Sequence, residues 1–72
     1  MNYEIISPEI KSTFNPKGKE VLLLLSGKMI INLSKDKIIN ISKDKPIVID
    51  RPYSLSCPNG PGTGRALRIT IS

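Results

Sequence analysis

The sequence contains no histidine and no tryptophan, and it has a single cysteine, Cys57. Histidine is the commonest metal ligand and the commonest general base in enzymes, so its absence argues against both kinds of site. A lone cysteine cannot form a disulfide within the chain, and a cysteine nucleophile would need a nearby base. We therefore expect no catalytic residues, no metal and no cofactor.

Aromatic residues are also scarce, being limited to Tyr3, Phe14 and Tyr53. Proteins that bind single-stranded nucleic acids stack bases on aromatic side chains, and no such platform is visible here. The net charge of +5 would attract an anionic partner, but four of the eleven Lys and Arg lie in two Ser-Lys-Asp-Lys segments. An aspartate separates the lysines in each segment, which is typical of solvated turns. Binding of nucleic acid is therefore kept only as an alternative function.

Long hydrophobic runs are absent, the longest being Val21 to Leu25. A helix that spans a bilayer needs about 20 apolar residues, so we expect no membrane association. The first ten residues lack the charged start and apolar stretch of a secretory signal. The sequence therefore predicts a cytoplasmic protein, and the unpaired Cys57 agrees with a reducing compartment.

The chain has 72 residues, which predicts one small β domain covering residues 1–72. A chain of this size buries only about 60% of the surface that it exposes when unfolded. Small domains usually gain further stability from disulfides, from a metal or from oligomerisation. Because the first two are closed off, we expect a homo-oligomer.

An eight-residue repeat runs from Ile31 to Pro46 and reads INLSKDKI and then INISKDKP. Each copy suggests a strand that ends in a short turn. A three-residue loop at 35–37 would set Ile31 opposite Ile41, with Asp36 or Lys37 in the backbone conformation that glycine usually adopts. This loop places five apolar residues on one face, whereas an even loop would set Asn40 opposite Ile31. The five are Met29, Ile31, Leu33, Ile39 and Ile41.

The second copy of the repeat leaves two alternatives open. The same loop arithmetic would pair Ile41 with Ile47 across a turn at 43–45. Pro46 has no amide hydrogen to donate, so the chain could instead form a corner there and pass to an opposing sheet.

Turn signals divide the rest of the chain into short strands. Residues 20–26 are apolar on both faces, and residues 65–72 alternate Ala66, Arg68 and Thr70 with Leu67, Ile69 and Ile71, a half-buried pattern. Residues 58–64 contain two prolines and three glycines, and they predict an exposed, mobile loop. We expect six to eight short antiparallel strands and no helix, which indicates a sandwich or barrel. Further strands are predicted at 47–49 and 53–57.

Glu20 and Gly27 have the spacing of glutamate, six residues and glycine with which the first motif of the cupins ends. Pro52 stands where their second motif has its proline. The chain therefore resembles the cupin family, and this resemblance implies an all-β fold, a small cupin-like barrel or jelly roll. About fifty residues are covered.

The departures from the cupin pattern concern the metal site. Phe14 and Pro16 stand where metal-binding cupins have two histidines, and Pro46, Ser54 and Cys57 replace the glycine, glycine and histidine of the second motif. Only Glu20 and Cys57 remain as donors, which are too few and too different in hardness for a metal site.

Two kinds of functional residue follow from this interpretation. A barrel that binds a small polar or anionic molecule would use Glu20, Tyr53 and Arg65. An oligomer would use the outward set of the 21–25 run, because one small barrel has only one interior and cannot bury both sets. We expect Leu22 and Leu24 to form that interface. The leading function is a non-catalytic structural or interaction module that self-associates, and the ligand-binding barrel and the basic nucleic-acid-binding protein are alternatives.

Overall fold

The computed structural model describes residues 2–8, 11–34 and 36–71, and it has eight strands and no helix among them. None of these residues therefore forms a helix of the length and hydrophobicity needed to cross a bilayer. The predicted all-β fold of six to eight short strands is confirmed. In chain order the strands are β1 (Asn2–Ile6), β2 (Lys11–Phe14), β3 (Lys19–Ser26), β4 (Ile30–Ser34), β5 (Lys37–Asn40), β6 (Ile47–Ile49), β7 (Tyr53–Ser56) and β8 (Arg65–Ile71).

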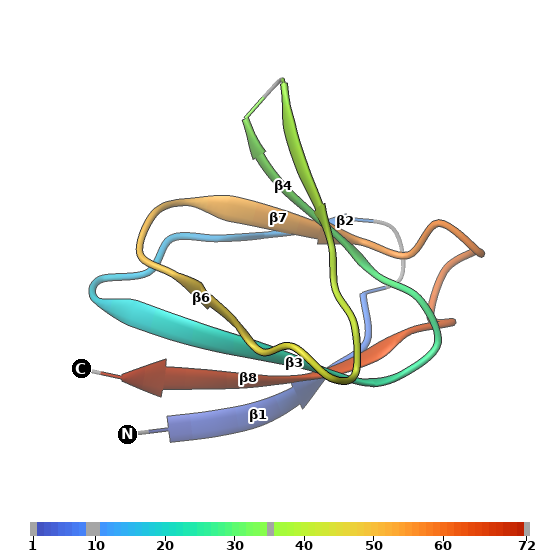
Figure 1. The fold of residues 1–72 in the computed structure, drawn as a ribbon, viewed down its shortest axis with the longest axis horizontal. Helices are drawn as coiled ribbons and strands as arrows, with labels where there is room; N and C mark the ends of the chain where they lie inside the picture. The colour runs from blue at the N-terminus through green and yellow to red at the C-terminus, as the bar shows by residue number, and fades with distance from the viewer. Residues whose placement is uncertain (1, 9–10, 35, 72) are drawn as a thin grey trace.

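The strands form two antiparallel sheets of four. Sheet I has the order β1-β8-β3-β6 and sheet II the order β2-β7-β4-β5. The first strand thus pairs with the eighth, the second with the seventh, the third with the sixth and the fourth with the fifth, which is a hairpin rolled up into a jelly roll. In Figure 1, sheet I lies below sheet II.

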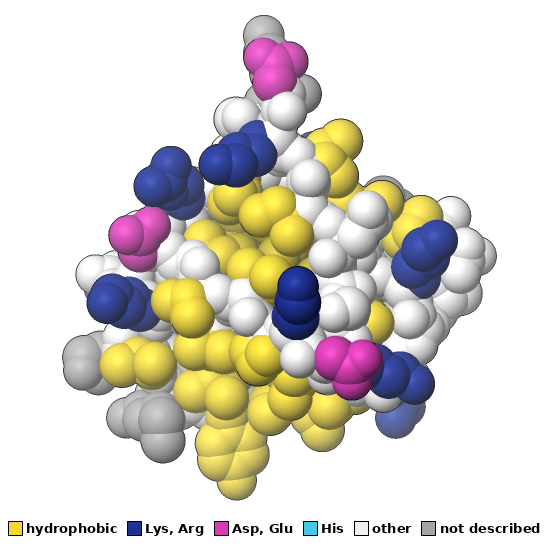
Figure 2. Space-filling view, in the orientation of Figure 1, with side chains coloured by type: hydrophobic (Ala, Val, Ile, Leu, Met, Phe, Trp, Pro, Cys, Tyr) yellow, Lys and Arg dark blue, Asp and Glu magenta, His cyan; other side chains and the backbone are white. Residues whose placement is uncertain are grey.

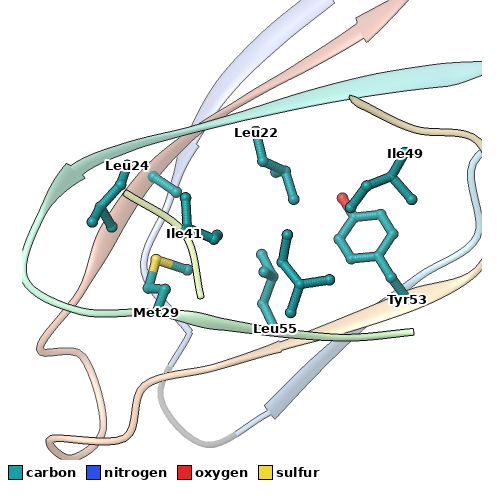
Figure 3. Packing of buried hydrophobic residues seen from close by; sticks show 9 residues of the cluster. Leu22, Leu24, Met29, Ile41, Ile49, Tyr53 and Leu55 are labelled. Atoms are coloured by element: carbon teal, nitrogen blue, oxygen red, sulfur yellow. The ribbon is translucent and has the colours of Figure 1, made fainter. Parts of the chain in front are cut away.

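The hydrophobic core fills the space between the two sheets (Figure 3). Side chains alternate between the two faces of a strand, so every second residue of each central strand reaches this space. Sheet I contributes Leu22, Leu24, Ile49 and Ala66, sheet II contributes Ile31, Tyr53 and Leu55, and Met29 and Ile41 flank them.

The repeat forms β4, β5 and a corner. Its five predicted core residues do share the inner side, because Met29, Ile31 and Ile41 are buried and Leu33 and Ile39 pack against them. The predicted register is wrong by two residues, since Ile31 lies opposite Ile39 instead of Ile41. A shift of two preserves which face each side chain occupies, so the face could be predicted although the register was not.

The loop geometry explains the difference in register. Ser34 pairs with Lys37 after an irregularity in the ladder, so Lys37 belongs to β5 and not to a three-residue loop. Lys35 lies outside the described residues. No described residue other than glycine has a positive φ, so the prediction that Asp36 or Lys37 adopts such a conformation is wrong.

The second copy of the repeat ends in the predicted corner. Ser42 and Lys45 form an isolated bridge, and the chain then enters β6, which pairs with β3 in sheet I. Of the two alternatives, the passage to the opposing sheet at Pro46 is therefore confirmed, and the pairing of Ile41 with Ile47 is wrong.

The loop at 58–64 packs closely against the turn that follows β3. Gly27 has a φ of 74°, and a Cβ built there would collide with the backbone carbonyl of Thr63. Gly62 has nearly the same φ, 72°, but a Cβ there would meet nothing within 4 Å. Alanine substitutions at these two positions would therefore separate the energetic cost of the backbone conformation, which both share, from the cost of the close approach, which only Gly27 has.

We expect Gly27→Ala to lower the free energy of unfolding by about 2–4 kcal/mol, because it adds a backbone collision to an unfavourable φ. The matched variant Gly62→Ala should cost only about 1 kcal/mol, since it incurs the conformational cost alone. Urea titrations monitored by circular dichroism would measure both. Equal losses in the two variants would contradict the close approach of the two loops.

Candidate functional site

A buried carboxylate lies between the sheets at the end where β3 begins. Glu20 is only 1% exposed. The hydroxyl of Tyr53 on β7 donates a hydrogen bond to Glu20 Oε1 over 2.6 Å. Arg68 on β8 donates from Nε to Oε1 over 2.9 Å and from Nη2 to Oε2 over 2.5 Å. The carboxylate is therefore held by a two-pronged arginine and a phenol, the geometry of a strong ion pair.

Two further contacts fix the Arg68 guanidinium. Its carbon lies 4.4 Å from the centre of the Phe14 ring, which in turn stacks on Tyr53 with 5.3 Å between ring centres. Nη1 donates to Glu4 Oε1 over 2.6 Å, and this second carboxylate is largely exposed. We call Glu4, Glu20, Tyr53 and Arg68 the charged cluster. It joins β1, β3, β7 and β8.

The contacts within the cluster set its protonation states. Burial raises the pKa of Glu20, but the hydrogen bonds from Arg68 and Tyr53 outweigh this effect and place the pKa below its usual 4.5. Burial, together with the adjacent Glu20, raises the pKa of the Tyr53 phenol. The hydrogen bond to Glu20 raises the pKa of Arg68. At neutral pH Glu20 and Arg68 are therefore ionised, and Tyr53 is neutral.

Arg68 and Thr70 line two hollows. The larger, of about 480 Å³, is lined by Asn15, Lys17, Gly18, Glu20, Arg68, Thr70 and Ile71. The smaller, of about 240 Å³, is lined by Asn2, Tyr3, Glu4, Arg68 and Thr70. Polar side chains thus surround the space at this end of the jelly roll, whereas Leu24, Met29 and Ile41 close the other end (Figure 3).

The structure brings together two of the three residues predicted to bind a ligand. Glu20 and Tyr53 share a hydrogen bond, as described above. Arg65 is exposed at the start of β8, three residues before Arg68, and Arg68 takes its place in the cluster. The sequence showed Arg68 only as a polar residue in an alternating strand. The signal that identifies it, its position beside Glu20 across the β3–β8 ladder, depends on a pairing between distant segments.

Cys57, the other donor expected from the cupin pattern, lies apart from Glu20. Its thiol contacts the carbonyl oxygen of Pro8 over 3.5 Å, just beyond the far end of β7 from Tyr53. Cys57 follows Tyr53 by four positions along an extended chain, a distance of about 13 Å. Among the described residues, no group of three His, Cys, Asp or Glu is placed to hold a metal.

The outer surface of sheet I is the second feature of functional interest. Tyr3, Ile5 and Val48 point away from the core and are 76%, 65% and 61% exposed. They lie in register with apolar residues on the two central strands, so that rows of apolar side chains cross the sheet. We call this surface the outer apolar face. It consists of Tyr3, Ile5, Val21, Leu23, Leu25, Val48, Leu67, Ile69 and Ile71.

The predicted orientation of β3 is wrong. Leu22 and Leu24, expected at an oligomer interface, are 0% and 7% exposed and belong to the core. The alternate residues of β3 point outward instead, because Glu20 faces inward to meet Arg68 and residues two apart share a face. By the same alternation, Ala66, Arg68 and Thr70 of β8 point inward. Leu67, Ile69 and Ile71 point outward.

Sheet II presents the opposite kind of surface to solvent. Its outward residues alternate with the core residues of β2, β7, β4 and β5. They are Lys11, Thr13, Ile30, Asn32, Ser34, Ile38, Asn40, Ser54 and Ser56. Most of these side chains are polar, as in a sheet that faces water on one side. Figure 2 shows hydrophobic side chains along the lower side of the molecule, where sheet I lies in Figure 1, and also near the centre of the view.

Comparison with known proteins found no matching family model, no matching curated protein and no matching solved structure.

Proposed function

We propose that this protein is a non-catalytic structural or interaction module that assembles with copies of itself through the outer apolar face of sheet I. The observation that carries the proposal is the contrast between the two sheets: one turns polar side chains to solvent, and the other turns nine apolar side chains outward. Contiguous apolar surfaces of this kind mark sites of protein association.

The size of the face supports a specific interface. Four strands about 4.8 Å apart and about six residues long cover roughly 400 Å² of flat area. The relief of the side chains enlarges this value towards the roughly 500 Å² per copy that a specific interface needs. The face is also about a tenth of the 4869 Å² that the chain exposes, which is the usual share for an interface of a small protein.

A second copy of the chain is the partner that fits this face best. Twisted sheets stack face to face with their strands about 30° apart and about 10 Å between sheets. Two copies of sheet I have the same twist and the same apolar surface, so each offers the other a matching sheet. The charged residues Lys19 and Arg65 lie at the ends of the face and not at its centre, where burial would be costly.

The charged cluster supports a role without catalysis. Glu20 is already neutralised by Arg68, and its pKa lies below 4.5, the opposite direction from that required of a general acid or base at neutral pH. The resemblance to cupins enters this proposal as a hypothesis about the fold family. Two features support it, the Glu20–Gly27 spacing on and just after β3 and the jelly-roll strand order.

The test is the mass of the protein in solution. Sedimentation equilibrium at about 10 μM should give at least twice the 7.9 kDa of one chain. The double variant Ile5→Lys with Val48→Lys places charges on two well-exposed positions of the face. It should raise the dissociation constant by about 100-fold or more, because each copy would have to bury two ammonium groups.

A matched control carries the same added charge on the other sheet. Ile38→Lys with Asn40→Lys adds two lysines to the outward side of β5 and should leave the mass unchanged. A protein that sediments as a single 7.9 kDa chain at several hundred micromolar would refute the proposal. Equal dissociation by both double variants would place the interface elsewhere.

A further inference from the structure

We propose that a small carboxylate replaces Glu4 on the Arg68 guanidinium, in the smaller hollow, and that the rest of the ligand extends past Arg68 and Thr70, which line both hollows, into the larger one. The two side chains already show the interaction, because Arg68 Nη1 donates to Glu4 Oε1 over 2.6 Å. Glu4 would thus occupy, in the free protein, the position of a ligand from solution. The charged cluster lies on the inner side of sheet I, whereas the proposed assembly uses the outer apolar face; Tyr3 and Ile71 belong to that face and also line the hollows.

Arg68 is held ready to receive such a ligand. Glu20 binds one edge of the guanidinium through Nε and Nη2, and the Phe14 ring covers its face at 4.4 Å. An arginine has five N–H groups, and the hydrogen bonds named above use three. The edge formed by Nη1 and Nη2 can therefore bind a carboxylate through two parallel hydrogen bonds, where Glu4 accepts only one.

Glu4 is a replaceable partner. Its side chain is 53% exposed, whereas that of Glu20 is 2% exposed. Exposed ion pairs contribute little to stability, because water and salt screen them and both side chains lose freedom. Glu4 lies on β1, an edge strand, and can turn into solvent without breaking the pair between Arg68 and Glu20.

The larger hollow, which shares Arg68 and Thr70 with the smaller one, offers further groups that suit a small carboxylate. Its volume of about 480 Å³ lies within the range of small-molecule sites. Lys17 adds a positive charge at its rim, and Thr70 and Asn15 supply a hydroxyl and an amide. Ile71 gives one wall an apolar surface. The ligand class is therefore a short molecule with one carboxylate for Arg68 and a polar or second acidic group within reach of Lys17.

A titration with succinate, followed by ¹⁵N NMR of the Arg68 Nε–H and of neighbouring amides, would test the inference. The wild-type protein should bind succinate saturably in the millimolar range. Glu4→Gln removes the competing carboxylate and should tighten binding by about 10-fold, because the end edge of Arg68 becomes free. Lys17→Gln should weaken binding about 5-fold, since it removes the rim charge.

Two matched controls carry the same changes of charge in the distant turn between Ser42 and Lys45. Asp44→Asn and Lys43→Gln should leave the affinity for succinate unchanged. The inference is overturned if neither the wild type nor Glu4→Gln approaches saturation at about 20 mM succinate, because a Kd in the low millimolar range would give near-saturation at that concentration. It is also overturned if the controls shift the affinity as much as the site variants, which would indicate a general charge effect. Tighter binding of inorganic phosphate than of succinate would refute the assignment to carboxylates. Sedimentation of the same samples keeps this result separate from the test of assembly.

Discussion

Replacing Glu20 by glutamine is expected to lower the free energy of unfolding by about 3–5 kcal/mol, the usual cost of breaking a buried ion pair by removing one partner. Arg68 would keep its charge, because hydrogen bonding raises its pKa, but would lose both hydrogen bonds to an ionised carboxylate. A 72-residue domain typically has about 4–11 kcal/mol of stability in all. The variant would therefore be close to unfolding at room temperature, as urea titration at one fixed protein concentration would show.

Glu4→Gln is the matched control, since it also removes a carboxylate that accepts from Arg68. Because Glu4 is exposed, its removal should cost less than about 1 kcal/mol. The double variant Glu20→Leu with Arg68→Met should recover most of the stability, because two packed apolar side chains replace a buried ion pair at little net cost. Equal losses from the Glu4 and Glu20 variants would contradict the burial of the pair.

The same pair predicts how stability depends on pH. The pKa of Glu20 in the folded chain lies below its ordinary value of 4.5, so folding favours its ionised form. The stability that this group contributes is complete above about pH 4.5 and is lost as the pH falls through the folded pKa. The difference between the wild type and Glu20→Gln should therefore shrink on acidification and stay constant between pH 6 and 8.

Much of the fold follows from local patterns that the sequence displays. The repeat places Met29, Ile31 and Ile41 on one inner face, because alternation within a strand needs no knowledge of the partner strand. Pro46 indicates the corner between the sheets as one of two alternatives, since it cannot donate to a ladder. The register of β4 and β5 could not be predicted from the side of the sheet that each residue occupies, because a shift of two residues leaves every side chain on the same side.

The charged cluster and the outer apolar face share one reason for being missed. Five consecutive apolar residues, 21–25, do not say which alternate set faces the core. The glutamate before them and the arginine on β8 decide the question, since together they can be buried where either alone would have to face water. That pairing joins residues 48 positions apart, and only the folded chain brings them to adjacent strands. Once Glu20 and Arg68 point inward, the remaining apolar side chains of both strands must point outward.

The orientation of β3 makes two neighbouring leucines behave differently when each is replaced by lysine. Leu22→Lys should unfold the chain, because it removes a fully buried side chain and leaves an unpaired charge in the core. The loss should exceed about 4 kcal/mol, beyond what most single substitutions cause.

Leu23→Lys should keep the β-sheet circular dichroism and the dispersed NMR spectrum of the folded chain. Leu23 lies on the outer apolar face, only partly covered by neighbours in its own sheet, so the folded single chain should lose about 1 kcal/mol. The lysine should instead weaken assembly, and sedimentation should detect smaller particles. An unfolded Leu23→Lys beside a folded Leu22→Lys would mean that sheet I faces the other way. If Leu23→Lys stays folded with unchanged mass, the orientation of β3 stands, but the outer apolar face is not the site of assembly. A charge at the centre of that face could not be buried between two copies without a large loss of affinity.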